Sequence, residues 1–145
     1  MLDWTGCVIR AAVARFNEVL PLTTFQETLS THLAAMQAHD FAAFLATLTS
    51  APELSLIMPN GRFTGGRAEA VATLEQWFAD PDWRIAFETV RTLETAELAM
   101  ALLHATYDDL DPSGQPYQLR YYLQLLFARQ DGQWRLVHDQ NTLIQ

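Results

Sequence analysis

Apolar residues in the first half of the chain recur three and four positions apart, which is the spacing of one face of a helix. Residues 8–20 show this spacing first, and Pro21 ends it. The pattern predicts a lead-in helix within residues 1–22. A secretion signal does not explain this segment, because Asp3 stands where a basic region belongs and two arginines interrupt the apolar run.

Two more helices are expected before residue 50. Thr24 and Glu27 have the spacing of a capping box, and the apolar positions of residues 25–36 fall on one helical face. Asp40 is placed to cap a shorter helix through residues 41–48. These two caps predict where each helix begins.

The pattern then changes to a short hairpin followed by another helix. Apolar residues alternate through residues 54–58, and the Pro-Asn-Gly sequence at 59–61 supplies the backbone for a tight reversal. Helical spacing returns in residues 68–78, and Asp-Pro at 80–81 stops it. A strand, a turn and a third helix of the domain are therefore expected here.

The second half of the chain has a period of two, which is typical of strands. Four long runs of this kind cover residues 83–93, 98–107, 117–128 and 134–144. Asp-Pro-Ser-Gly at 111–114 and Asp-Gly at 131–132 are turn sequences. Long strands joined by short turns predict an antiparallel meander.

Helices followed by strands indicate an α+β fold, in which three helices pack on one face of a curved, mainly antiparallel sheet. No repeat, low-complexity tract or linker interrupts residues 23–145, so these residues are expected to form a single domain after the lead-in helix. A bent sheet that wraps around a long helix leaves a hollow at its open end. We therefore expect a pocket for a small molecule.

Charge and composition exclude several classes of function. Seventeen acidic residues outnumber nine basic ones, all of them arginine, and the resulting negative surface disfavours nucleic acid and anionic membranes as partners. No stretch approaches the roughly 20 apolar residues of a membrane span. The single cysteine, Cys7, fits a reducing compartment, and we expect a cytoplasmic protein.

No metal or cofactor is expected either. The four histidines and Cys7 lack the spacing of a zinc site. Residues 109–114 match the first half of a calcium loop, but the position of its bidentate glutamate is Arg120.

Three short motifs accompany this order of elements: Pro-Asn-Gly at 59–61, Gly66-Arg67 at the start of a helix, and Asp-Gly-Gln-Trp-Arg-Leu-Val-His-Asp at 131–139. Together they resemble the SnoaL-like and DUF4440-like members of the nuclear-transport-factor-2-like (NTF2-like) superfamily over residues 23–144. The resemblance implies a cone-shaped, cystatin-like fold. Because the superfamily contains ketosteroid isomerases, polyketide cyclases, dehydratases and non-catalytic association domains, it implies no single reaction.

The resemblance allows the steroid isomerase site to be compared residue by residue. The family's helix-one tyrosine corresponds to His32, counted from Asp40. Its general base, which precedes the Pro-x-Gly turn, corresponds to Met58, and a thioether cannot abstract a proton. Its oxyanion-stabilising acid corresponds to Gln124, or to Leu123 if the register slips by one. The chain departs from the isomerase pattern where the chemistry resides.

Other candidates come from the alternation of strand side chains. His104 is expected to face inward with its alternate neighbours, Met100, Leu102 and Thr106. On the last strand one of two alternating sets faces inward, and Asp139 and Asn141 belong to the same set. His104, Asp139 and His32 are then the predicted catalytic residues, able to move a proton or to bind a carbonyl oxygen. The alternative for each is a structural, hydrogen-bonded role.

Two functions follow from these residues. In the first, a small apolar, polyketide-like or steroid-like molecule binds in the pocket of a lyase, isomerase or cyclase. Its predicted contacts are Met58, Tyr122, Gln124, Asn141 and Trp77. In the second, the chain is a non-catalytic association domain. Both faces of the third long strand carry apolar residues, which predicts a homodimer with Tyr121 or Trp134 at its interface.

Overall fold

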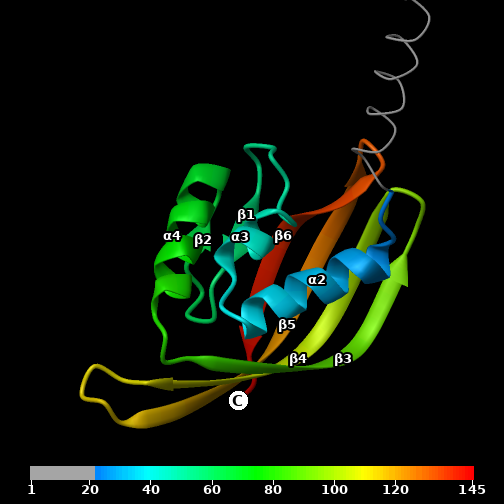
Figure 1. The fold of residues 1–145 in the computed structure, drawn as a ribbon. Coiled ribbons are helices and arrows are strands. Elements are labelled where there is room, and N and C mark those ends of the chain that lie inside the picture. Colours follow the sequence, from blue (N-terminus) through cyan, green and yellow to red (C-terminus); the bar gives the residue numbers. More distant parts are fainter. Residues whose placement is uncertain (1–21) are drawn as a thin grey trace, which may run out of the picture.

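The computed structural model describes residues 22–145, so the predicted lead-in helix lies outside the described residues except for Leu22. Figure 1 shows the helices in front of a single sheet. The elements follow in the order α2 (Phe25–Gln37), α3 (Phe41–Leu45), β1 (Ser55–Ile57), β2 (Phe63–Thr64), α4 (Arg67–Ala79), β3 (Arg84–Glu94), β4 (Leu98–Leu110), β5 (Pro116–Gln130) and β6 (Gln133–Leu143).

The predicted caps begin the first two of these helices. Thr24 Oγ1 accepts a hydrogen bond from the Glu27 N–H at 3.1 Å, and the Glu27 carboxylate accepts one from the Thr24 N–H at 2.8 Å. This is a complete capping box. Asp40 Oδ1 accepts from the Ala43 N–H at 3.0 Å and caps α3 in the same way.

The strands form one six-stranded sheet in the order β2-β1-β6-β5-β4-β3. The four long strands are antiparallel, as predicted, and only the short β1 pairs in parallel, with β6, among the strands of residues 22–145. Asp131 and Gly132 join β5 to β6 with φ values of 51° and 75°. Two successive left-handed residues are what a tight hairpin turn requires, which explains the Asp-Gly sequence.

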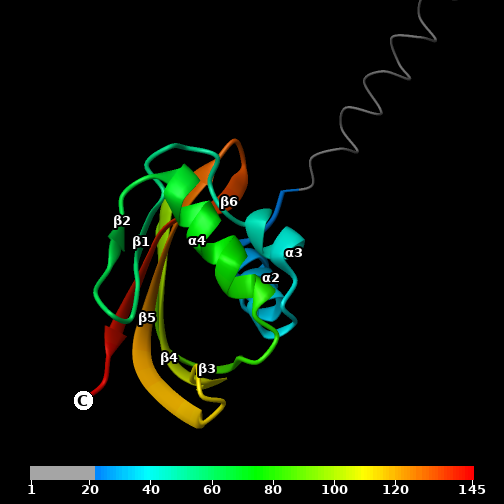
Figure 2. The same cartoon turned by 90° about the vertical axis from the view of Figure 1, so that its left-hand side faces the viewer.

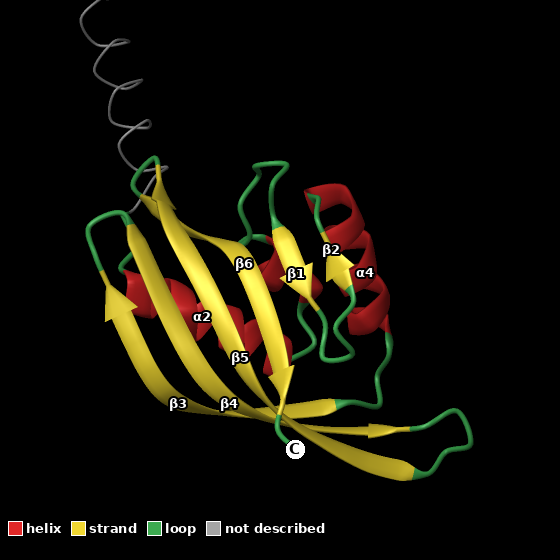
Figure 3. Cartoon of the chain, turned by 180° about the vertical axis from the view of Figure 1, so that it is seen from behind, coloured by secondary structure: helices red, strands yellow, loops and turns green. Residues whose placement is uncertain are grey.

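The sheet bends around α2, as Figure 2 shows most clearly. The helices lie on its concave side, while Figure 3 shows the convex face with no helix of the described chain over it. The core fills the space between the concave face and the helices. Its largest fully buried side chains include Trp83, Phe25, Phe44, Phe127, Leu103, Leu123, Leu125 and Leu136. The predicted α+β cone, with three helices on a curved sheet, is confirmed.

The prediction of which β4 residues face inward is wrong. His104 and its alternate neighbours lie on the convex face, and the buried set consists of Ala99, Ala101, Leu103, Ala105, Tyr107 and Asp109. Small alanine side chains suit the concave face because a helix must pack closely over a sheet that curves toward it. Met100, Leu102, His104 and Thr106 therefore lie on the outside of the sheet.

None of the helices in residues 22–145 is long and apolar enough to cross a membrane.

Candidate functional site

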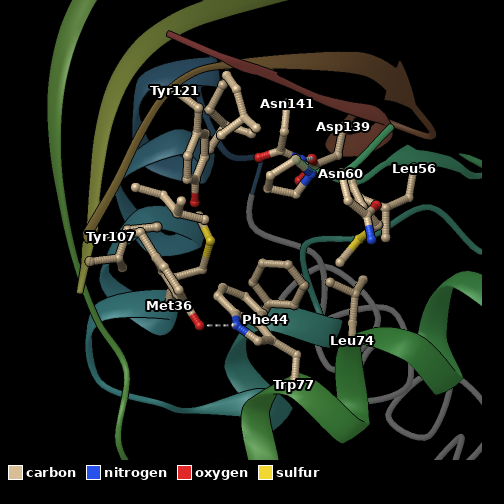
Figure 4. Close-up of a pocket in the computed structure, with 16 residues that line it drawn as sticks. Met36, Phe44, Leu56, Asn60, Leu74, Trp77, Tyr107, Tyr121, Asp139 and Asn141 are labelled. Carbon is tan, nitrogen blue, oxygen red and sulfur yellow. Dashed lines mark hydrogen bonds between the residues drawn. The ribbon is translucent and has the colours of Figure 1, made fainter. Parts of the chain in front are cut away.

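A cavity of about 310 Å³ opens between the concave face of the sheet and the helices. Figure 4 shows Tyr121, Asn141 and Asp139 along one side of it, with Leu74 and Trp77 opposite. Its wall consists of Met36, Phe44, Leu56, Met58, Pro59, Asn60, Leu74, Trp77, Ile85, Tyr107, Leu119, Tyr121, Leu123, Asp139, Asn141 and Leu143. The wall is thus mainly apolar and aromatic, with a few polar groups.

A β-bulge brings Asp139 and Asn141, two polar residues of β6, to the wall of this cavity. Leu136 faces Phe127 across the sheet and His138 faces Leu126, so Val137 is an extra residue without a partner. Trp134 and Leu136 are buried before the bulge, and Asp139 is buried after it. The bulge shifts the alternation by one position. Neither of the two predicted alternating sets therefore faces inward along the whole strand.

Asn141 anchors the polar side of the cavity. Its Nδ2 donates to the Ile57 carbonyl oxygen at 2.7 Å and to Asp139 Oδ1 at 3.0 Å. The first of these bonds ties β6 to the backbone at the end of β1. Because both amide hydrogens are used, the Asn141 carbonyl oxygen remains as an acceptor.

Asp139 is a buried carboxyl group, 8% exposed, on the wall of the cavity. No ion pair to Asp139 occurs among the described residues. Burial raises its pKa to about 7, and the hydrogen bond from Asn141 only partly offsets this effect. A carboxyl group with a pKa near neutrality can both accept and return a proton at physiological pH.

Two tyrosines and a tryptophan continue the wall. Trp77 Nε1 donates to the Tyr107 hydroxyl at 3.2 Å, and this hydroxyl donates to Asp109 Oδ2 at 2.6 Å. Burial and the bond to Asp109 raise the pKa of Tyr107 above its ordinary value. Burial, together with the charge of Asp139, does the same for the pKa of Tyr121. Both phenols are therefore neutral at physiological pH.

His32 lies behind the cavity wall rather than on it. Its ring packs on Phe44, with 4.5 Å between ring centroids, and Phe44 lines the cavity. The Thr47 hydroxyl donates to the Phe44 carbonyl at 2.6 Å, so it accepts from His32 Nδ1 at 2.7 Å. His32 Nε2 then carries no proton, and it has no partner within residues 22–145. Burial lowers the pKa of His32 to about 3, which keeps the ring neutral.

The structure brings together only some of the predicted site residues. Asp139, Asn141, Met58 and Trp77 line the cavity. His104, Tyr122 and Gln124 do not, because their strands direct them to the convex face, where the rings of His104 and Tyr122 meet edge to face. At the position where the register was left open, Leu123 faces inward and Gln124 outward.

Sequence analysis missed Tyr107 and Tyr121 as cavity residues. Tyr121 shares a face with the apolar residues Leu123, Leu125 and Phe127 and was interpreted as part of an apolar stripe, whereas Tyr107 lies on the face of β4 that was expected to point outward. The available signal was the phenol itself, since a buried tyrosine hydroxyl requires a hydrogen-bonding partner. The predicted interface residues Tyr121 and Trp134 are 4% and 5% exposed, so both pack inside this chain and neither is free to meet a second copy.

Solved structures share this fold at low sequence identity. A ketosteroid isomerase-like protein from Erwinia carotovora atroseptica is 18% identical with a TM-score of 0.70, over 86% of this chain and 96% of that one. The CaMKII hub of S. rosetta is 16% identical with a TM-score of 0.64, over 86% and 100%. A protein with a cystatin-like fold from Caulobacter vibrioides is 22% identical with a TM-score of 0.66, over 83% and 87%. These similarities show the fold alone.

No curated protein was found to match this chain. A model of the SnoaL-like domain matches residues 26–142, which extend from α2 to β6. The resemblance to DUF4440-like members stays a prediction. With the cone-shaped fold and the sequence match in agreement, the chain belongs to the SnoaL-like domain family and has the fold of NTF2-like and ketosteroid isomerase-like proteins.

Proposed function

We propose that the domain binds a small, largely apolar molecule in its cavity, and that Asp139 exchanges a proton with the polar group of that molecule. The observation that carries this proposal is a buried carboxyl group with a pKa of about 7 on an otherwise mainly apolar wall. Asn141 holds the carboxyl group in place through its amide. The cavity volume lies at the small end of the range of about 300–1,000 Å³ that is usual for ligand pockets.

The chemistry available at this wall is general acid–base catalysis. A neutral Asp139 donates a proton to a carbonyl or hydroxyl oxygen, and the ionised form removes one from a carbon or oxygen acid. The Tyr121 hydroxyl, which faces the same cavity, supplies a hydrogen bond for a developing charge. These are the steps of a lyase, isomerase or cyclase. His104 has no part in the proposal, and His32 supports the wall through Phe44.

Binding of a neutral fluorescent probe, N-phenyl-1-naphthylamine, tests the proposal through two matched variants. Met58→Trp places a large side chain at the cavity wall, and Met100→Trp places the same side chain on the convex face. Both methionines are half-buried, so the two substitutions disturb the fold to a similar extent. We expect Met58→Trp to weaken probe binding by at least about tenfold, because it fills the cavity.

The control variant Met100→Trp is expected to bind the probe like the wild type. Circular dichroism and thermal melting establish that both variants are folded. Failure of the wild type to bind the probe, or equal binding by the two variants, would contradict the proposal.

A second candidate function is association with another copy of the chain through the convex face. Three large apolar side chains on or beside this face are exposed: Leu93 by 57%, Leu98 by 50% and Tyr122 by 43%. Burial of such a group between subunits would stabilise a homodimer. The CaMKII hub of S. rosetta has the same fold. The two candidate functions use opposite faces of the sheet, so one chain can have both.

The convex-face candidate predicts a dimer of about twice 16.4 kDa in sedimentation equilibrium. Tyr122→Glu should convert it to a monomer, because a charge would be buried at the interface. Phe63→Glu is the matched control, since Phe63 is exposed by 62% on β2, which β1 and β6 separate from β5, and it lies outside the group formed by Leu93, Leu98 and Tyr122. A wild type that stays monomeric at high concentration removes this candidate, as does an equal effect of the two substitutions.

A further inference from the structure

The hydrogen-bond donors on the cavity wall are largely used up by the protein itself. Asn141 donates both amide hydrogens, one to the Ile57 carbonyl oxygen and one to Asp139. The indole N–H of Trp77 donates to the Tyr107 hydroxyl, and the Tyr107 hydroxyl donates to Asp109. No arginine, lysine or histidine lies among the residues that line the described cavity.

The groups on the cavity wall that remain available to a ligand are mostly hydrogen-bond acceptors. The Asn141 carbonyl oxygen, the Asp139 carboxylate and a lone pair of the Tyr107 hydroxyl can each accept a hydrogen bond. Tyr121 keeps a hydroxyl proton to donate, and Asn60 keeps its amide hydrogens at the exposed rim. A ligand that fits this wall must therefore bring donors of its own.

Charge and aromatic rings add a second constraint. An ionised Asp139 has no cation among the described residues to balance it. The rings of Phe44, Trp77, Tyr107 and Tyr121 line the same cavity, and the faces of such rings attract cations. The chain as a whole carries a net charge of −8, which draws cations toward it and repels anions.

We propose that the ligand of this cavity is an apolar molecule with a protonated amine, whose ammonium group donates to Asp139 and lies among the aromatic rings. This inference rests on the proposed function, because it names the class of molecule that the same cavity takes. An ammonium group supplies up to three donors and the missing positive charge together. A carboxylate would meet Asp139 with no cation to separate them, and a carbonyl compound would find few donors.

Three probes with the same six-carbon chain separate these alternatives: hexylamine, 1-hexanol and hexanoate. Their affinities for the whole protein are measured at pH 8 by calorimetry and by displacement of N-phenyl-1-naphthylamine. We expect hexylamine to bind at least about tenfold more tightly than hexanol, and hexanoate not to bind. Asp139→Asn removes the charge with little change of shape. It should reduce the affinity for hexylamine at least about tenfold and the affinity for hexanol much less, because only the amine loses an opposite charge.

The pH dependence supplies a readout that a purely structural role of Asp139 would not give. Because the pKa of Asp139 is about 7, its carboxylate is mostly ionised at pH 8 and mostly protonated at pH 6. Hexylamine affinity should therefore fall about tenfold between these values, while hexanol affinity changes much less because the alcohol carries no charge. Tyr121 on β5 and Asn141 on β6 face Asp139, and the pKa of Tyr121 is raised, so neither group ionises in this range. The residues that line the same cavity from α2, α3 and β1 are Met36, Phe44 and Leu56, and all three are apolar.

Each outcome separates the inference from the proposed function. Equal affinities for amine and alcohol, or an amine affinity that Asp139→Asn leaves unchanged, overturn the inference while the cavity still binds. A protein that binds N-phenyl-1-naphthylamine but none of the hexyl probes also overturns it. Only the loss of all binding, including that of the fluorescent probe, removes the proposed function as well.

Discussion

Asp139→Asn is expected to stabilise the domain by about 3 kcal/mol at pH 8. The pKa of Asp139 in the folded chain is about 7, against an ordinary value of 3.8. Each unit of this difference corresponds to about 1.4 kcal/mol, so full ionisation of the folded protein costs about 4 kcal/mol. The neutral amide avoids this cost. It brings two N–H donors that the cavity must satisfy, and this explains why the expected gain is smaller.

The sign of the effect depends on pH. A folded pKa above the unfolded one means that the contribution of the protonated carboxyl to stability is complete below about pH 4, and is lost as the pH rises through 7. Wild-type stability should fall over this range, and the variant should lack that dependence. At pH 4 the variant should be less stable than the wild type by about 1 kcal/mol. Urea unfolding at both pH values measures the difference.

The control for this prediction is Asp82→Asn, since Asp82 is an exposed aspartate in the segment before β3. It should change the stability by less than about 0.5 kcal/mol at either pH. Destabilisation of Asp139→Asn at pH 8 would contradict this expectation, because it would mean that contacts in the folded domain stabilise the ionised carboxylate. A carboxylate kept in place at a cost in stability is typical of a functional group, because selection for stability alone would remove it.

Trp83→Ala is expected to destabilise the domain by about 4 kcal/mol, within the range of about 3–5 kcal/mol for loss of a buried aromatic side chain. Trp83 is fully buried. Its ring stacks on His39 with 3.7 Å between centroids and on Trp77 with 4.0 Å, and its Nε1 donates to the Trp77 carbonyl at 2.8 Å. The substitution also frees Trp77, so the cavity should bind N-phenyl-1-naphthylamine more weakly.

Trp83→Phe separates packing from hydrogen bonding in the same place. It keeps an aromatic ring between His39 and Trp77 but loses the bond to the Trp77 carbonyl. We expect a loss of about 1–2 kcal/mol in urea unfolding, and probe binding close to that of the wild type. Equal losses for the alanine and phenylalanine variants would show that stacking on Trp83 does not hold this end of the cavity together.

The order of the elements was predictable because local chemistry determines it. A threonine or aspartate just before a helical pattern caps the helix, as Thr24 and Asp40 do here. Asp131 and Gly132 adopt the two left-handed conformations of a tight turn. These effects act within a few residues. The strand period of two is equally local, so the four long strands were found within a few residues of their ends.

The face of each strand was not predictable in the same way, because it depends on what lies across the sheet. On β4, His104 and its alternate neighbours were expected to face inward, but the opposite face, which carries three alanines with Leu103 and Tyr107, packs against the helices. On β6 the bulge at Val137 reverses the alternation halfway along the strand. Nothing in the sequence near Val137 marks it as unpaired. Asp139 and Asn141 were predicted as candidates because they belong to one of the two alternating sets of the last strand. Tyr107 and Tyr121 were missed.

The proposed function depends on Asp139, a buried carboxyl group on the cavity wall whose pKa is near neutrality. The side-chain carboxyl carbon of Asp139 in ¹³C-labelled protein, assigned by comparison with Asp139→Asn, reports its ionisation directly in an NMR titration. We predict a midpoint at about pH 7, well above the ordinary aspartate value of 3.8. A midpoint near 4 would mean that water or a cation reaches the carboxylate, and it would contradict both the proposed proton transfer and the role of the cavity.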